Sequence, residues 1–146
     1  MKISTKGRYA LRMLLDLAEH GNEGYVSLKD VAQRQGISKN YLEQIITLLK
    51  NTEMLKTTRG SQGGYKLAKP PRHYTVGDVL RLTEGNLAPV ACLVDEINQC
   101  ERSSFCITLD IWRGLERVIN DYLDGITLQD ILDRHRERNG VNDYYI

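Results

Sequence analysis

The sequence has no run of apolar residues long enough to cross a membrane, a span that takes about 18 consecutive residues. The first 14 residues, MKISTKGRYALRML, mix charged with apolar side chains. They contain neither the apolar core nor the cleavage site of a secretory signal peptide. We therefore expect a cytoplasmic protein rather than a membrane-spanning or secreted one.

Residue types that build common catalytic sites are also scarce. The three histidines, His20, His73 and His135, are dispersed, and no carboxylate pair lies near them in the sequence. The glycine-rich stretch TTRGSQGGYKL at 57–67 does not match the phosphate-loop pattern G-x-x-x-x-G-K-[ST]. These absences argue against an enzyme and against nucleotide binding.

What is present is an ordinary globular composition with an uneven charge distribution. Of the 146 residues, 41% are apolar and 27% are charged, which is enough for a real core. Residues 1–81 carry 14 Lys and Arg against 7 Asp and Glu, whereas residues 82–146 carry 6 against 12. The basic half, at +7, is the candidate for a polyanionic partner.

The first half has the pattern of a helix-turn-helix. Apolar residues at helical spacing predict a helix over 4–20, and Ser27 caps a short helix that stops at Gly36. Ser38 caps a third helix over about 39–51. Two helices separated by Gly-Ile-Ser are typical of this DNA-binding motif.

A β-hairpin is predicted directly after the third helix. Residues 54–58 and 65–68 read as strands, and 59–64 form the turn between them. A helix-turn-helix followed by a hairpin is a winged helix, in which glycines allow a sharp turn and a close approach to another surface. Arg59 at that turn is suited to a narrow minor groove.

Two further helices and a long irregular segment complete the predicted chain. A helix over 75–85 precedes an irregular segment over 86–104. A long helix over 105–124 carries Trp112, Leu115, Ile119 and Tyr122 at alternating spacings of three and four residues. It has more apolar surface than one small core needs, so we expect a second subunit to cover it. A final helix runs over 127–138.

The cysteines are clustered. Cys92, Cys100 and Cys106 lie within 15 residues, and an odd number of cysteines argues against a disulfide framework. The expected position of Cys106 in the first turn of the long helix would stabilise its thiolate. Three thiolates suit an iron–sulfur cluster or zinc, and a set of small buried residues is the alternative.

Taken together, these stretches resemble the IscR–NsrR–CymR superfamily of bacterial winged-helix transcription regulators. The matching segments are KGRYALRMLLDLA, VAQRQGISKNYLEQI, RGSQGGYKL, TVGDVLRLTEG and DGITLQDIL, in order along nearly the whole chain. The resemblance implies a mainly α fold, with a winged helix-turn-helix DNA-binding domain, a β-hairpin wing and a long dimerisation helix. The corresponding parts are 1–84 for the DNA-binding domain, 85–106 for the cysteine loop, 105–126 for the dimerisation helix and 127–146 for the C-terminal helix and tail.

The resemblance also implies roles for individual residues. Arg59, with Gly60 beside it, corresponds to the minor-groove reader. The residues implied to face the major groove are Ser38, Asn40, Tyr41, Glu43 and Gln44. The implied protein is a homodimeric repressor that binds a pseudo-palindromic site in double-stranded DNA, with Trp112, Leu115, Ile119 and Tyr122 at the dimer interface.

Cys92, Cys100 and Cys106 match the branch of the superfamily that holds a 2Fe–2S cluster. Where IscR has a histidine as the fourth ligand, this chain has Leu109, and where NsrR-like proteins have an acidic residue, it has Arg8. The fourth ligand stays open among Asp110, an exogenous thiol or water, a donor from the partner's first helix, and the loop carboxylates Asp95, Glu96 and Glu101. The competing hypotheses are a thiol or zinc sensor without a cluster and a CymR-like regulator controlled by a partner protein.

Overall fold

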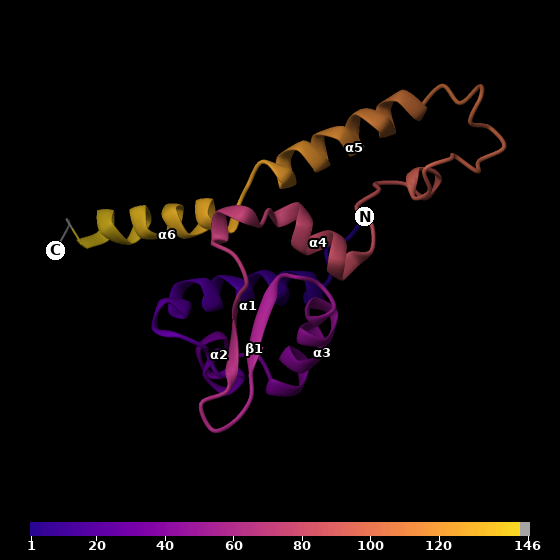
Figure 1. The fold of residues 1–146 in the computed structure, drawn as a ribbon. Coiled ribbons are helices and arrows are strands. Elements are labelled where there is room, and N and C mark those ends of the chain that lie inside the picture. The colour runs from indigo at the N-terminus through magenta and orange to yellow at the C-terminus, as the bar shows by residue number, and fades with distance from the viewer. Residues whose placement is uncertain (144–146) are drawn as a thin grey trace.

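Helices dominate the computed structural model, which describes residues 1–143 (Figure 1). The three helices of the N-terminal half are α1 (Thr5–His20), α2 (Leu28–Gln35) and α3 (Lys39–Lys50), and the hairpin consists of β1 (Leu55–Thr58) and β2 (Gly64–Leu67). The second half contains α4 (Val76–Glu84), α5 (Leu109–Asp124) and α6 (Leu128–Asp143). Short 3₁₀ turns lie at Gly21–Glu23, Pro71–His73 and Ala91–Leu93.

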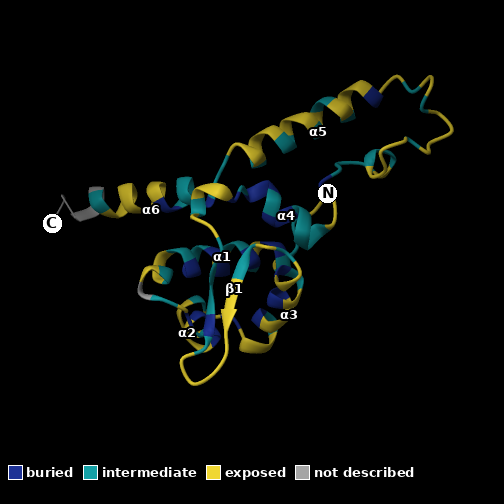
Figure 2. Ribbon diagram, in the orientation of Figure 1, coloured by how far each residue is buried: buried dark blue, intermediate teal, exposed yellow. Residues whose placement is uncertain are grey.

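The core sits between α1, α3, α4 and the hairpin. Its fully buried side chains come from the apolar stripes that the sequence predicts, among them Met13, Leu42, Ile45 and Val79. Leu128, the first residue of α6, is also fully buried and belongs to the same cluster. This core holds the helix-turn-helix and the wing as one unit (Figure 2).

The expected N-caps form at the beginnings of the helices. The hydroxyls of Ser27 and Ser38 accept hydrogen bonds from backbone N–H groups three residues later. Thr75 and Asp78 form a reciprocal capping box at α4. These bonds satisfy donors that a helix leaves free at its N-terminus, and they fix where each helix starts.

Tyr74 fastens the base of the hairpin to the core. Its ring is buried, and its hydroxyl donates to the backbone oxygen of Met54 at 3.1 Å. The same hydroxyl accepts from the backbone N–H of Lys69 at 3.0 Å. Because Met54 precedes β1 and Lys69 follows β2, one side chain ties together both ends of the wing.

A polar clamp joins α5 to α4. The guanidinium of Arg81 donates to both carboxylate oxygens of Asp124, each at 2.8 Å, and to the amide oxygen of Asn120 at 2.7 Å. At Gly77, an added Cβ would lie 2.0 Å from the Asp124 carboxylate, so the close contact requires glycine there. The clamp holds the C-terminal end of α5 against α4, and from there α5 extends away from the helix-turn-helix and the wing (Figure 1).

Two helix bounds differ from the sequence expectation. The long helix begins at Leu109 rather than 105, so Cys106 lies before the helix and not in its first turn. Phe105 and Ile107 are 61% and 96% exposed, and with no apolar surface beneath them a helical turn gains no packing energy there. The last helix continues past 138 to Asp143, although the five added residues, NGVND, are weak helix formers.

Further expectations concern the segment before α5, the C-terminal tail and the absence of a membrane span. The segment over 86–104 is irregular as expected, apart from its short 3₁₀ turn. The final residues of the expected C-terminal tail, 144–146, lie outside the described residues. Within residues 1–143, no helix is both long enough and apolar enough to cross a membrane.

Candidate nucleic-acid interface and cysteine loop

Helix α3 presents a polar face to solvent beside the wing. Asn40, Glu43 and Gln44 are exposed on it, and Ser38 is exposed at its N-cap. The opposite face of α3 is buried through Leu42, Ile45, Ile46 and Leu49. The helix is therefore held by its apolar face, while the side chains predicted to reach bases stay free to do so.

Tyr41 is the exception on this helix, because its ring is half-buried. It meets the ring of Tyr9 edge-to-face, with centroids 5.6 Å apart, and Arg12 lies 5.1 Å from the Tyr9 ring. Arg12 in turn donates to the side-chain oxygen of Gln35 at 3.2 Å and to its backbone oxygen. Tyr41 thus braces α3 against α1 and α2, in addition to its predicted contact with DNA.

Arg59 and Gly60 stand at the exposed tip of the wing. Gly60 has a φ of +107°, a conformation that side chains with a Cβ avoid. At Gly64, a Cβ would lie 2.2 Å from the backbone oxygen of Val26, which bridges to the neighbouring Tyr65. The glycines therefore give the hairpin a tight tip and a close fit to the chain before α2, with the Arg59 side chain projecting from them.

A groove of about 470 Å³ lies between the wing, the N-terminal end of α2 and one side of α3. Its lining includes four basic side chains, from Lys29, Lys39, Lys50 and Arg59, against the single carboxylate of Glu43. Lys39 approaches Glu43 at 3.9 Å, an exposed contact of small energy. The sequence analysis did not single out these lysines, although the +7 charge of residues 1–81 signalled a basic surface.

The three cysteines lie on the segment between α4 and α5 and do not form an assembled site. Cys92 is half-buried in the turn Ala91–Leu93, Cys100 is exposed, and Cys106 is half-buried near the start of α5. Among the side chains that the structure describes, no group of three His, Cys, Asp or Glu residues is arranged to hold a metal ion.

The thiol of Cys106 is nevertheless polarised by the beginning of α5. Its Sγ lies 3.4 Å from the Thr108 hydroxyl. This hydrogen bond, together with the backbone N–H groups of Thr108 and Leu109, lowers the pKa of Cys106 below its ordinary value. The helix terminus therefore stabilises the thiolate from just outside the helix.

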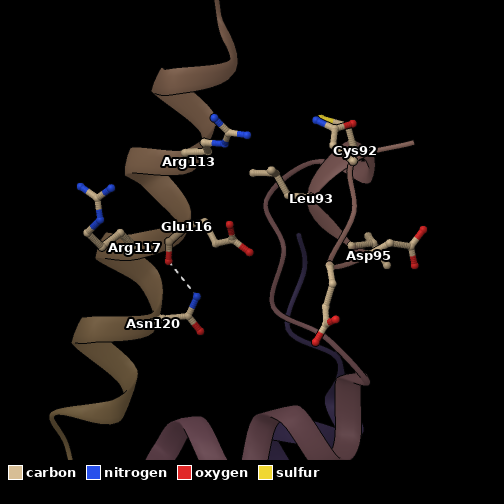
Figure 3. A pocket seen from close by; sticks show the side chains of 10 residues that line it. Cys92, Leu93, Asp95, Arg113, Glu116, Arg117 and Asn120 are labelled. Carbon is tan, nitrogen blue, oxygen red and sulfur yellow. Dashed lines mark hydrogen bonds between the residues drawn. The ribbon is translucent and has the colours of Figure 1, made fainter. Parts of the chain in front are cut away.

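A pocket of about 600 Å³ separates the first part of the cysteine segment from α5 (Figure 3). Cys92 and Asp95 line it from the loop, and Arg113, Glu116 and Arg117 line it from the helix. The amide nitrogen Nδ2 of Asn98, also in this lining, is buried and finds no hydrogen-bond partner among the described residues. This part of the loop therefore borders an open pocket and has one buried donor that the described residues leave unsatisfied.

Helix α5 has two apolar faces with different surroundings. Ile119 and Leu123 pack toward α4, against the cluster formed by Val76, Leu80 and Leu87. The other face carries a stripe of side chains that are 42–66% exposed, and much of α5 is drawn as exposed in Figure 2. This exposed stripe consists of Ile111, Leu115, Val118 and Tyr122.

The predicted dimer residues are therefore divided between these surroundings. Leu115 and Tyr122 belong to the exposed stripe, Ile119 packs within its own chain, and Trp112 is half-buried. Ile111 and Val118, which widen the apolar stripe of this helix in the sequence, complete the exposed stripe.

Comparison with known proteins gives consistent matches along the chain. A profile of the Rrf2 family, described as an iron-dependent transcriptional regulator, matches residues 3–134. The protein rrf2 of Nitratidesulfovibrio vulgaris is 44% identical over 133 residues, covering 90% of this chain and 87% of the relative. The HTH-type transcriptional regulator CymR of Bacillus subtilis is 40% identical over 131 residues, covering 90% and 89%. The regulator IscR of Aliivibrio salmonicida is 38% identical over 132 residues, covering 90% and 77%.

Solved structures agree with these matches. IscR of T. potens superposes with a TM-score of 0.76 at 41% identity, covering 94% of this chain and 90% of that one. The global cysteine regulator CymR of B. subtilis also has a TM-score of 0.76, at 36% identity, covering 92% and 98%. These neighbours confirm the expected mainly helical, winged helix-turn-helix fold.

Proposed function

This chain belongs to the Rrf2 family of transcriptional regulators, and from that premise we propose that it binds DNA as a homodimeric repressor controlled by an iron–sulfur cluster. The family description and the names of the relatives are those of regulators rather than enzymes, as the dispersed histidines led us to expect. IscR and CymR relatives are about equally similar, so DNA binding and cluster control are argued separately from the residues.

The basic groove between α3 and the wing is the observation that carries DNA binding. A helix as exposed as α3 fits the major groove, and an arginine on a narrow hairpin fits the adjacent minor groove. In this arrangement Ser38, Asn40, Glu43 and Gln44 face base edges. The lysines of the groove then lie along the phosphates between the two grooves.

The exposed stripe on α5 is the proposed dimer interface. Contiguous apolar side chains at helical spacing on an otherwise polar helix are typical of a surface that a partner covers. Two copies packed through this stripe would present two α3 helices to one duplex, and such a pair suits a pseudo-palindromic site.

The cysteines fit an iron–sulfur cluster by their chemistry, and the loop must close to bring them together. Thiolates are the preferred cluster ligands, and the lowered pKa of Cys106 favours its ligand form. The pocket of about 600 Å³ beside Cys92 provides space for this closure. A bound cluster would supply the response to iron or oxidant, and Cys92, Cys100 and Cys106 would hold it. Asp95, Glu96, Glu101 and Asp110 are the candidates in this chain for the fourth position.

DNA binding is tested through the wing. Duplexes selected by the wild-type protein from a random library should be rich in A·T where Arg59 enters. Arg59→Ala should weaken binding to them by about 1–3 kcal/mol and relax that preference, measured by fluorescence anisotropy. Arg72→Ala is the matched control, because it removes an exposed arginine from the 3₁₀ turn at Pro71–His73, beyond the base of the wing. Equal affinities for the wild type and Arg59→Ala would refute the minor-groove role.

The cluster is tested by purifying the protein without oxygen. We expect coloured protein with visible absorption, lost in each of the Cys92→Ser, Cys100→Ser and Cys106→Ser variants. Because an oxygen donor binds iron more weakly than thiolate or imidazole, the cluster should also be lost readily in air. Ala substitutions of Asp95, Glu96, Glu101 and Asp110 then identify the fourth ligand by a shortened cluster lifetime. A spectrum that survives all three cysteine substitutions would contradict the cluster assignment.

The arrangement of the thiols also supports a second candidate function, a thiol or zinc sensor without a cluster. Cys100 is exposed and Cys106 has a lowered pKa, which are the properties of an oxidisable sensor thiol. In that case the protein purified without oxygen is colourless, and elemental analysis finds either zinc or no metal. A colourless, metal-free protein whose DNA binding is insensitive to oxidants would instead favour CymR-like control by a partner protein.

A further inference from the structure

Two lysines lie directly opposite each other on one face of the wing, which we call the outer face. The hairpin register pairs Lys56 with Lys66. The flanking pairs, Leu55 with Leu67 and Thr57 with Tyr65, belong to the other face, where the leucines and the tyrosine pack on the core. Residues that are directly paired share one side of the sheet, so both lysine side chains lie on the side opposite the leucines and the tyrosine.

This arrangement is unfavourable in the protein alone. Like charges directly opposite each other on antiparallel strands destabilise the pair. In the described part of the chain, neither lysine takes part in an ion pair. Both line a pocket of about 290 Å³ whose lining includes a third lysine, Lys69, and no carboxylate. The concentrated positive charge therefore lacks an anionic partner among residues 1–143.

One of the lysines is also held in place. The Nζ atom of Lys66 lies 4.7 Å from the ring centroid of Tyr25, which precedes the residue that bridges to β2. A cation–π contact restricts the position of the ammonium group without neutralising its charge. Lys66 is thus an ordered cation with its charge available to a ligand.

The position of the pair relative to Arg59 identifies the ligand. Lys56 precedes Arg59 by three residues, which is about 10 Å of strand. The minor groove is about 7.5 Å deep and about 6 Å wide between its two phosphate backbones. When Arg59 reaches into the groove, the wing face toward α3 meets the nearer backbone, and the outer face meets the farther one.

We propose that Lys56 and Lys66 form a second phosphate-binding surface, which holds the far strand of the minor groove that Arg59 enters. This inference rests on the proposed DNA binding and adds to it a contact on the side of the wing away from α3. The phosphates neutralise the paired lysines, so the repulsion within the free protein is relieved on binding. The contact is made to backbone and carries no sequence information.

The test is the salt dependence of binding by a Lys56→Gln/Lys66→Gln variant. Each lost phosphate contact reduces the slope of log affinity against log salt by about 0.9, so the double variant should lose about 1.8. Between 50 and 200 mM salt, the wild type should then lose about 12-fold more affinity than the variant. The probes are a duplex selected by the wild type and a scrambled duplex of equal length, and the ratio of their affinities should not change.

The matched control is Arg134→Gln/Arg138→Gln, which removes two exposed positive charges from α6, a helix that lies away from the wing tip (Figure 1). Its salt slope should equal that of the wild type. The melting temperature of the lysine variant should not fall, because the repelling pair is removed. A wild-type slope in the lysine variant would overturn this inference and leave the proposed function intact. A wild type that selects no duplex would instead refute the proposed function itself.

Discussion

At the level of single residues, the buried carboxylate of Asp16 links two helices of the N-terminal half. It is 2% exposed and accepts hydrogen bonds from Arg34 at 2.7 and 3.0 Å and from Gln35 at 2.9 Å. Burial alone would raise the pKa of Asp16, but the bonds from Arg34 and Gln35 outweigh it, so this pKa lies below its usual value. The carboxylate thereby ties α1 to α2, the first helix of the helix-turn-helix.

This network makes part of the stability depend on pH. A depressed folded-state pKa stabilises the protein above the ordinary aspartate pKa, near pH 4, and this stabilisation is lost as pH falls through the lowered value. Asp16→Asn should therefore destabilise the protein by about 1.5–3 kcal/mol at pH 7, the range for hydrogen bonds to a charged group. The gap to the wild type should narrow below about pH 4.

Urea unfolding at a series of pH values measures this gap. Asp133→Asn serves as the control, because Asp133 is exposed on α6 and pairs with Arg136 at only 3.8 Å. That change should alter stability by less than about 1 kcal/mol at every pH. If the Asp16→Asn gap kept its full size in acid, the ionised carboxylate could not be its cause.

At the level of helices and strands, the sequence predicts an element's position correctly where residues only a few positions apart determine it. The beginnings of α2, α3 and α4 were predictable because Ser27, Ser38 and Thr75 are N-caps whose effect depends only on the next few residues. The wing was predictable from its glycines and the flanking alternation. Periodicity misplaced the start of α5, because Phe105 and Ile107 are apolar in sequence but have no surface to pack on in the structure.

The residues of the candidate site also divide into those that a local motif predicts and those that depend on tertiary contacts. The positions of Arg59 and of the exposed residues of α3 follow from the motif, so sequence alone could find them. The lysine pair depends on the register of β1 and β2, and the Arg81–Asp124 clamp joins residues 43 positions apart. Such contacts depend on tertiary geometry, which no local pattern encodes. The expectation for Cys106 shows both effects, since the helix start was wrong and the thiolate is stabilised nonetheless.

At the scale of the whole molecule, the charge asymmetry matches the division of labour that we propose. The basic half contains the helix-turn-helix and the wing, and the acidic half contains the cysteine segment, α5 and α6. An acidic second half is repelled by DNA, which favours an orientation with the wing and α3 toward the duplex. The Arg81 clamp joins these two halves. A change in the position of α5 would therefore be transmitted through α4 to the helix-turn-helix and the wing.

The proposed dimer is the assembly on which this arrangement depends, and Leu115 is the residue with which to test it. Leu115 lies in the exposed stripe, so Leu115→Glu leaves the monomer's core untouched and places a charge in the proposed interface. An unpaired charge buried there costs about 3 kcal/mol or more, which weakens dimerisation by over about 100-fold. Ile119 is less suitable, because it packs against α4 and its substitution would also disturb the fold.

Sedimentation over a range of concentrations should show a dimeric wild type and a monomeric Leu115→Glu variant with an unchanged circular dichroism spectrum. Arg117→Glu is the control, since Arg117 lies on another face of α5 and its charge change is at least as large. The monomer should retain one α3 helix and one wing, so its binding to a half-site persists while binding to the full pseudo-palindrome falls to the half-site level. A Leu115→Glu protein that stays dimeric and binds both probes like the wild type would place the interface elsewhere on the chain.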